Sequence, residues 1–185
     1  MCQFRTSSTS LVYRRAMAKT RQLRVVDPTF LQTAPVRDHL IQTIPASAEA
    51  TFRCLEDGDA WGQWIDAIQS VEWTSPKPYG VGTTRTVVLK PGGPLEEEFF
   101  AWEDGRRMAF YFVRSGLPVF AAFAEDYVLT PQGDDRCELR WSWAFEGAGI
   151  FGPAQGLVNK GFKRQGAKSL AALAEYMKAN AAKYQ

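Results

Sequence analysis

The sequence predicts an α+β fold in which one long C-terminal helix covers a strongly curved antiparallel sheet. From Ile68 to Phe145 apolar residues recur with a period of two, and short turns separate the runs, which is typical of antiparallel strands. From about Ala154 to Lys183 the period becomes that of an amphipathic helix. A curved sheet and a single helix leave a space between them, and we expect this space to be a ligand cavity.

Composition fits one globular domain with an extension. Aromatic residues make up 13% and apolar residues 45% of the 185 residues, enough for a buried core. No apolar run approaches the ~20 residues that a membrane-spanning helix needs, so we expect no stable membrane insertion. The three cysteines have neither disulfide-framework nor metal-ligand spacing, which favours a reducing, cytoplasmic location.

Residues 1–35 are interpreted as a basic, disordered leader and connector, with the folded domain at 36–185. Six basic residues and no acidic residue precede Asp27, a composition shared with organellar transit peptides and with polybasic arms. Met17 is an alternative start, which would make the leader an artefact. The remaining 16 basic and 20 acidic residues give the domain a net charge of −4. This mild acidity argues against a nucleic-acid-binding core.

The domain is expected to begin with a strand and two short helices. Residues 36–44 alternate enough for the first strand. Ser47 is a suitable N-cap for a helix over residues 48–57. Asp59 is predicted to cap a second short helix at 60–66, which carries the tryptophan-rich sequence AWGQWID.

Six more strands complete a seven-stranded antiparallel sheet. Their spacing is that of hairpins, with turn sequences such as SPKPYGVG, PGGP and TPQGDD between them. The predicted strands lie at residues 68–74, 83–89, 95–103, 108–113, 119–129 and 136–145. In the last strand the alternation is clean, and one face is apolar and heavily aromatic. That face consists of Cys137, Leu139, Trp141, Trp143 and Phe145.

One glycine interrupts the apolar stripe of the C-terminal helix. The stripe is formed by Val158, Phe162, Leu170, Leu173, Met177 and Tyr184. Gly166 lies among these residues, where a glycine costs about 1 kcal/mol of helix propensity relative to alanine. We interpret Gly166 as a place where the helix backbone passes close to the sheet or to a bound molecule.

Several segments together resemble one known family. They are IPAS followed by a helix, W-x-x-W-I, SVEW with VGTTRTVVL, EEFFAWEDGRRMAFYF, DYVLTPQGDDRCELRWSWAFEG and KSLAALAEYM. In this order and spacing they resemble the polyketide cyclase/dehydrase and lipid-transport branch of the START-like (SRPBCC) superfamily. The resemblance covers the chain after the leader and connector. It implies a helix-grip fold, with a seven-stranded sheet wrapped around the long C-terminal helix and two small helices closing one end. It also implies binding of hydrophobic or amphipathic small molecules.

Aromatic side chains are the candidates for the cavity lining, because they bury large areas and pack against flat ligands. Arg85 is a further candidate, since a basic residue that points inward could pair with a ligand carboxylate or enolate. The predicted ligand-binding residues are Trp64, Arg85, Trp102, Tyr111, Phe123, Tyr127, Trp141, Trp143, Phe162 and Gly166.

The sequence singles out no catalytic residue. His39 is the one histidine, so a multi-histidine metal site is excluded, and we expect His39 at the surface. In LEEEFF, alternation puts Glu97 on one face and its two neighbours on the other. We expect these glutamates to keep an exposed face soluble; a carboxylate in the cavity would instead have a raised pKa and could act as an acid or base. No cofactor motif is present.

Three functions remain open. The first is a carrier or sequestering protein for a hydrophobic or aromatic, lipid- or polyketide-like small molecule, as a monomer or homodimer. The second is a cyclase or dehydratase without metal or cofactor, in which Arg85, Tyr127 or a glutamate assists proton transfer. The third is a protein-interaction module with an exposed apolar patch. An enzyme needs convergent polar groups in a dry cavity, whereas a carrier needs only volume and an apolar lining.

Overall fold

A computed structural model describes residues 20–185 of the chain. The predictions for Cys2, Met17 and the first part of the basic leader lie outside these residues. In the part of the chain that the structure describes, no helix is long and apolar enough to cross a bilayer.

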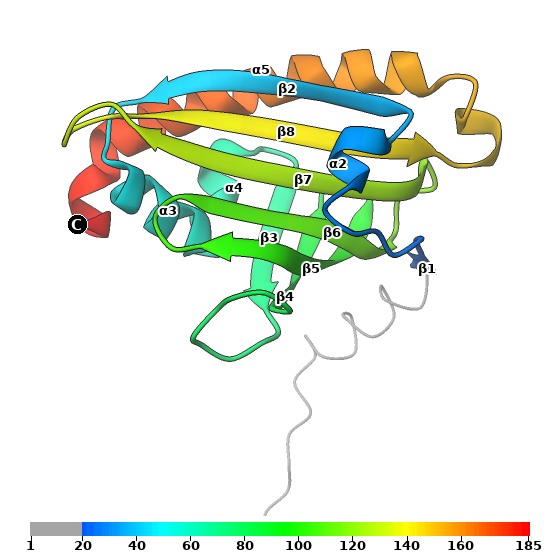
Figure 1. The fold of residues 1–185 in the computed structure, drawn as a ribbon, viewed down its shortest axis with the longest axis horizontal. Coiled ribbons are helices and arrows are strands. Elements are labelled where there is room, and N and C mark those ends of the chain that lie inside the picture. The colour runs from blue at the N-terminus through cyan, green and yellow to red at the C-terminus, as the bar shows by residue number, and fades with distance from the viewer. Residues whose placement is uncertain (1–19) are drawn as a thin grey trace, which may run out of the picture.

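A curved antiparallel sheet forms the body of the molecule (Figure 1). Its seven main strands are paired in the order β2-β8-β7-β6-β5-β4-β3, and a two-residue strand, β1 (Arg21–Gln22), pairs with β6. The seven predicted strands are confirmed with end shifts of a few residues. They are β2 (Val36–Ile44), β3 (Ile68–Trp73), β4 (Thr84–Leu89), β5 (Gly93–Glu103), β6 (Arg107–Ser115), β7 (Phe120–Pro131) and β8 (Cys137–Gly147).

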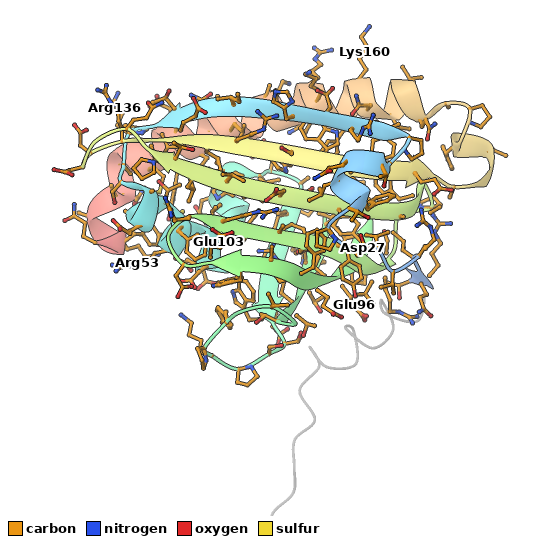
Figure 2. All side chains as sticks on the ribbon, in the orientation of Figure 1. Asp27, Arg53, Glu96, Glu103, Arg136 and Lys160 are labelled. Atoms are coloured by element: carbon orange, nitrogen blue, oxygen red, sulfur yellow. The ribbon has the colours of Figure 1, made fainter. Side chains whose placement is uncertain are left out.

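The long helix α5 (Gln155–Asn180) runs beside β2 across the concave side of the sheet (Figure 1). It continues into a 3-10 turn, η2 (Ala181–Tyr184), and a 3-10 turn, η1 (Gly149–Phe151), precedes it. This arrangement of sheet and helix is the helix-grip fold that the sequence predicts. Figure 2 shows charged side chains such as Arg136 and Lys160 at the periphery of the molecule.

Two short helices follow β2, as predicted. They are α3 (Ala48–Glu56) and α4 (Trp61–Trp64). Ser47 caps α3, because its hydroxyl accepts a hydrogen bond from the Ala50 amide at 3.1 Å. The predicted Asp59 cap is wrong: α4 begins after Ala60 without a side-chain cap. Asp57 makes the polar contact in this turn instead, by accepting from the Asp59 amide.

The inner face of the sheet carries the main core. The predicted alternation of β8 is confirmed, with Leu139, Trp141 and Trp143 among the buried residues of this face. The outer face carries a second, smaller cluster in which Phe30 packs over the small side chains of Ala122, Ala124 and Ala144.

This outer cluster differs from the prediction of a disordered connector up to residue 35. Residues 20–35 instead lie along the outer face of the sheet. They include β1 and a short helix, α2 (Phe30–Thr33), which contacts β7 and β8. The Leu23 amide donates to the Val113 carbonyl at 3.0 Å, and the Arg24 amide donates to the Ala121 carbonyl at 2.9 Å. The predicted boundary at residue 36 therefore falls inside a packed unit.

Candidate functional site

A cavity of about 270 Å³ lies between the inner face of the sheet and α5. Its wall is formed by side chains from α4, from strands β3 to β8 and from α5. Because the sheet is curved, strands that lie far apart in it can contribute to the same wall. Gln165 lines the cavity and is also exposed, which places an opening beside α5. The apolar part of the wall includes Trp61, Ile65, Ile68, Val87, Leu89, Leu95, Phe110, Phe112, Leu117, Val119, Phe120, Phe123, Trp141 and Phe162.

The structure brings six of the ten predicted residues together in this wall. They are Arg85, Phe123, Tyr127, Trp141, Phe162 and Gly166. The Phe162 ring of α5 meets the Phe123 and Trp141 rings edge-on, with centroids 5.5 and 5.6 Å apart. Helix and sheet thus contribute aromatic groups to the same wall.

Tyr111 does not reach the cavity. It lies on the outer face, where its ring stacks on that of Phe100 with centroids 6.2 Å apart. Its neighbours Phe110 and Phe112 point inward and line the cavity. The sequence misleads here because residues 20–35 cover the outer face of this strand. Both faces of β6 are therefore apolar, and alternation does not distinguish them.

The other three residues that were predicted to line the cavity but do not are tryptophans, and they pack around it. Trp64 packs against Trp61, with ring centroids 4.8 Å apart, and it is Trp61 that lines the cavity. Trp102 packs edge-on against Phe52 at 5.3 Å. Trp143 donates its indole N–H to Asn159 Oδ1 of α5 at 2.8 Å.

Gly166 lies where the helix passes close to the sheet, in agreement with the interpretation of the sequence. A Cβ atom at this position would be 2.9 Å from Trp141 Cζ3 and 3.1 Å from Leu40 Cδ1. The missing side chain lets the helix backbone form part of the cavity wall.

A buried ion pair crosses the cavity wall between two neighbouring strands. Arg85 of β4 is opposite Glu97 of β5, and its Nε donates to Glu97 Oε2 at 2.5 Å. The two side chains are 1% and 4% exposed. The guanidinium also lies over the rings of Trp61 and Phe110, with its central carbon 4.4 and 4.7 Å from the ring centroids. Glu97 therefore contradicts the expectation that all three glutamates of LEEEFF are exposed.

A second buried carboxyl, Glu125 of β7, lies in the same wall. Its Oε2 accepts from the Tyr127 hydroxyl at 2.8 Å and from the Trp141 indole N–H at 3.1 Å. The sequence reasoning missed this residue. The signal was present, because Phe123, Glu125 and Tyr127 alternate along one strand and must share a face.

The two carboxyl groups have different protonation states. Burial, together with the nearby charge of Glu97, raises the pKa of Glu125 to about 8. Burial also raises the pKa of Glu97, but the Arg85 guanidinium in contact with it opposes that increase. One cation cannot balance two carboxylates in an apolar cavity. Glu97 is therefore the carboxylate partner of Arg85, and Glu125 is a neutral acid near pH 7.

Other reactive groups lie outside this site. His39 is exposed on β2, as expected. Cys54 is buried, and desolvation raises the pKa of its thiol to about 12, so it is not a nucleophile at neutral pH. Among residues 20–185 no group of three histidine, cysteine, aspartate or glutamate side chains is arranged to hold a metal ion.

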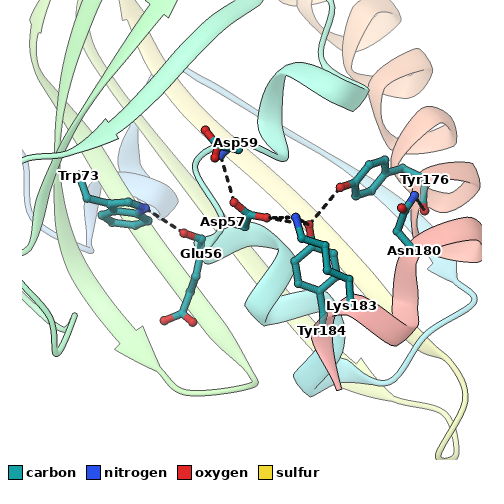
Figure 3. Close-up of polar contacts among 8 residues, drawn as sticks. All are labelled: Glu56, Asp57, Asp59, Trp73, Tyr176, Asn180, Lys183 and Tyr184. Carbon is teal, nitrogen blue, oxygen red and sulfur yellow. Dashed lines mark hydrogen bonds and ion pairs between the residues drawn. The ribbon is translucent and has the colours of Figure 1, made fainter.

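A separate polar cluster ties the C-terminus to α3 (Figure 3). Asp57 accepts from Lys183 Nζ at 2.6 Å and from the Tyr184 hydroxyl at 2.9 Å. The Tyr176 and Tyr184 hydroxyls are 3.0 Å apart. None of these residues lines the cavity. We interpret this cluster as a clamp that holds the end of the long helix.

Comparison with known proteins agrees with this geometry. Residues 39–178 match the family model described as polyketide cyclase / dehydrase and lipid transport. The uncharacterized protein Rv2574 of Mycobacterium tuberculosis is 40% identical over 128 residues, which are 68% of this chain and 75% of that protein.

Two solved structures share the fold at low sequence identity. The ZhuI aromatase/cyclase from Streptomyces sp. R1128 has a TM-score of 0.67 and 11% identity, over 78% of this chain and 94% of that one. A START superfamily protein from Mycobacterium smegmatis has a TM-score of 0.64 and 16% identity, over 76% of this chain and 98% of that one. With the family match spanning most of the described domain, the chain belongs to the polyketide cyclase / dehydrase and lipid transport family.

Proposed function

We propose that this protein binds compact, largely apolar ligands, namely flat aromatic or polyketide-like molecules, in the cavity between the sheet and α5. The observation that carries the proposal is the cavity itself, whose wall is aromatic or aliphatic apart from a few polar groups. Small-molecule sites have this composition, with a small number of placed polar groups that orient the ligand.

The size of the cavity favours a ring system over a long-chain lipid. Ligand pockets commonly measure ~300–1,000 Å³, and this cavity of about 270 Å³ lies just below that range. The rings of Phe112 and Phe123 are parallel, with centroids 4.4 Å apart, as are those of Tyr127 and Trp141 at 5.5 Å. Such flat surfaces suit a flat ligand.

A cavity-filling substitution on α5 tests the proposal. Ser169 is buried and lines the cavity, whereas Ala171 is exposed on the same helix. Binding of naphthyl methyl ketone, measured by isothermal titration calorimetry, should be 1:1 in the wild type. It should be lost in Ser169→Phe and kept in the matched control Ala171→Phe. Equal binding by all three proteins would show that the ligand binds outside the cavity.

A second candidate, a dehydratase or cyclase, is favoured by one observation: a neutral carboxylic acid, Glu125, lies in the same cavity wall as Arg85. A buried acid of this kind can donate a proton to a leaving hydroxyl or a carbonyl oxygen. Incubation with a bicyclic β-hydroxy ketone that loses water to form a naphthol provides the test. The enzyme hypothesis expects naphthol fluorescence with the wild type and none with Glu125→Gln. Equal rates with and without protein would eliminate it.

A further inference from the structure

We propose that the cavity selects uncharged ligands that carry a carbonyl or hydroxyl oxygen, and that it discriminates against carboxylates. This inference rests on the proposed binding function and specifies its ligand class. The ligand oxygen would accept a hydrogen bond from the Arg85 guanidinium, with the rest of the ligand against the aromatic wall.

The first argument is an unsatisfied donor. The guanidinium of Arg85 has five N–H groups, and its hydrogen bond to Glu97 uses the one on Nε. Nη1 is buried and has no hydrogen-bond partner among the described residues. The rings of Trp61 and Phe110 next to it offer π-faces but no lone pairs. A buried donor of a charged group without an acceptor is costly, so a ligand oxygen placed here gains more than an apolar atom would.

The second argument is charge balance. The ionised groups in the wall are Arg85 on β4 and Glu97 on β5, and their charges cancel. Tyr127 on β7 is neutral, since burial raises the pKa of its hydroxyl well above 10. α5 contributes only the uncharged Gln165 and Ser169 to the polar lining. A ligand carboxylate would leave a net negative charge in an apolar cavity, close to Glu97, whereas an uncharged oxygen would leave the balance intact.

The third argument is a second donor in the same wall. Glu125 Oε2 already accepts two hydrogen bonds, from Tyr127 and Trp141. The acid proton therefore belongs on Oε1, where Glu125 is a donor rather than an acceptor near pH 7. A carbonyl or hydroxyl oxygen has lone pairs with which it can accept a hydrogen bond from such a donor. The polar part of the wall thus offers donors to a neutral oxygen.

A series of three ligands with the same shape tests the inference on the wild-type protein. They are naphthyl methyl ketone, naphthoate and isopropylnaphthalene, all substituted at the same ring position. Affinities are measured by calorimetry or by tryptophan fluorescence at pH 7. We expect the ketone to bind about tenfold or more tightly than the hydrocarbon, because a charged donor gains an acceptor. We expect naphthoate to bind at least tenfold more weakly than the ketone.

The outcomes separate this inference from the proposed function. If the hydrocarbon binds as tightly as the ketone, or naphthoate binds most tightly, the cavity binds ligands but the inference is wrong. If none of the three binds, the proposed function fails and the inference fails with it.

A charge variant provides a second, independent test. In Glu97→Gln/Glu125→Gln the two acids become amides of the same shape, and Arg85 remains as the one charge in the wall. The ratio of naphthoate to ketone affinity should then rise by tenfold or more. An unchanged ratio in the folded variant would overturn the role of charge balance. Because the wild-type series needs no substitution, the inference stays testable if this variant does not fold.

Discussion

Inside the cavity, Glu125 exchanges water for two hydrogen-bond donors, the Tyr127 hydroxyl and the Trp141 indole N–H. These donors are uncharged, so they do not repay the cost of burying a carboxylate next to the charge of Glu97. Glu125 is therefore a neutral acid, which gives the apolar cavity a hydrogen-bond and proton donor. The chemistry of the site depends on this difference between two glutamates that share a cavity wall with Arg85.

Glu125→Gln should change how stability depends on pH. The folded pKa of Glu125 is about 8 and the reference value is 4.5, so between these pH values the folded state holds a proton that the unfolded state has released. This contribution to stability is complete below pH 4.5 and is lost as pH rises through about 8. Glutamine does not titrate. From pH 5 to pH 9 the variant should therefore gain ~4 kcal/mol in unfolding free energy relative to wild type.

Urea denaturation of both proteins at several pH values measures this difference. Because all other titrating groups are shared, subtracting the two curves isolates Glu125. A difference that does not vary with pH would mean that Glu125 is ionised in the folded protein.

The Arg85–Glu97 pair should show strong coupling. Arg85→Met leaves a buried carboxyl without its partner and should cost ~3–5 kcal/mol in unfolding free energy. Glu97→Leu should have a similar cost. The double variant replaces the pair by apolar side chains and should cost much less than the sum. Additive effects in chemical denaturation of the three variants would show that the two groups do not interact.

At the residue scale, the sequence predicted that Arg85 lines the cavity but did not predict that Glu97 and Glu125 do so as well. An arginine within an apolar strand stands out by itself, whereas a glutamate beside a second acidic residue, as in AEDYV, has the appearance of a solvated face. Only the parity of the strand distinguishes Glu125 from Asp126. Parity becomes visible once Phe123 and Tyr127 are placed inward.

At the scale of the elements, α5 is held close to the sheet at Gly166. Trp141, which a side chain here would contact, is itself stacked on Tyr127 with ring centroids 5.5 Å apart, so it has little freedom to move away. Close packing thus outweighs helix propensity at this position.

Two alanine substitutions in α5 should have opposite effects. Gly166→Ala should destabilise the protein by ~1–3 kcal/mol, because its Cβ would lie 2.9 Å from the Trp141 ring. Gly161→Ala is the matched control: beyond the adjacent backbone of its own helix, no described atom lies within 4 Å of a Cβ there. The gain in helix propensity should stabilise the protein by up to ~1 kcal/mol. Thermal or urea denaturation measures both. Stabilisation by both substitutions would show that α5 is not in tight contact with the sheet.

Element types and order were predictable, because the periods of two and 3.6 are distinct in most of the chain. Which face of β6 points into the cavity was not predictable, because MAFYFV is apolar on both faces. Tyr111 was therefore predicted in the cavity although it lies on the outer face. A strand covered on both faces carries no alternation from which its orientation can be derived.

For the whole molecule, the N-terminal residues 20–35 matter to the fold as a cover for the outer face of the sheet. Their signal in the sequence is indirect: Ala122, Ala124 and Ala144 lie side by side on that face and leave room for Phe30. A proline-punctuated segment without periodicity gives no direct evidence of packing.

Phe30→Ala should therefore destabilise the whole domain, by ~3–5 kcal/mol, because it removes a buried ring from the outer cluster. Val25→Ala, at a side chain that is 60% exposed, should change the unfolding free energy by less than about 0.5 kcal/mol. Urea denaturation compares the two. Equal, small effects would indicate that residues 20–35 do not contribute to the folded unit.

The central claim is that ligands bind inside the cavity, and the six tryptophans allow the most direct test of it. Trp61 and Trp141 line the cavity, whereas Trp73 and Trp102 do not. Titration of the ¹⁵N-labelled protein with naphthyl methyl ketone, followed through the indole N–H resonances, should shift Trp61 and Trp141 to saturation at one ligand per chain. Trp73 and Trp102 should shift much less. Larger shifts at Trp73 and Trp102, or no shift at any tryptophan, would contradict the claim.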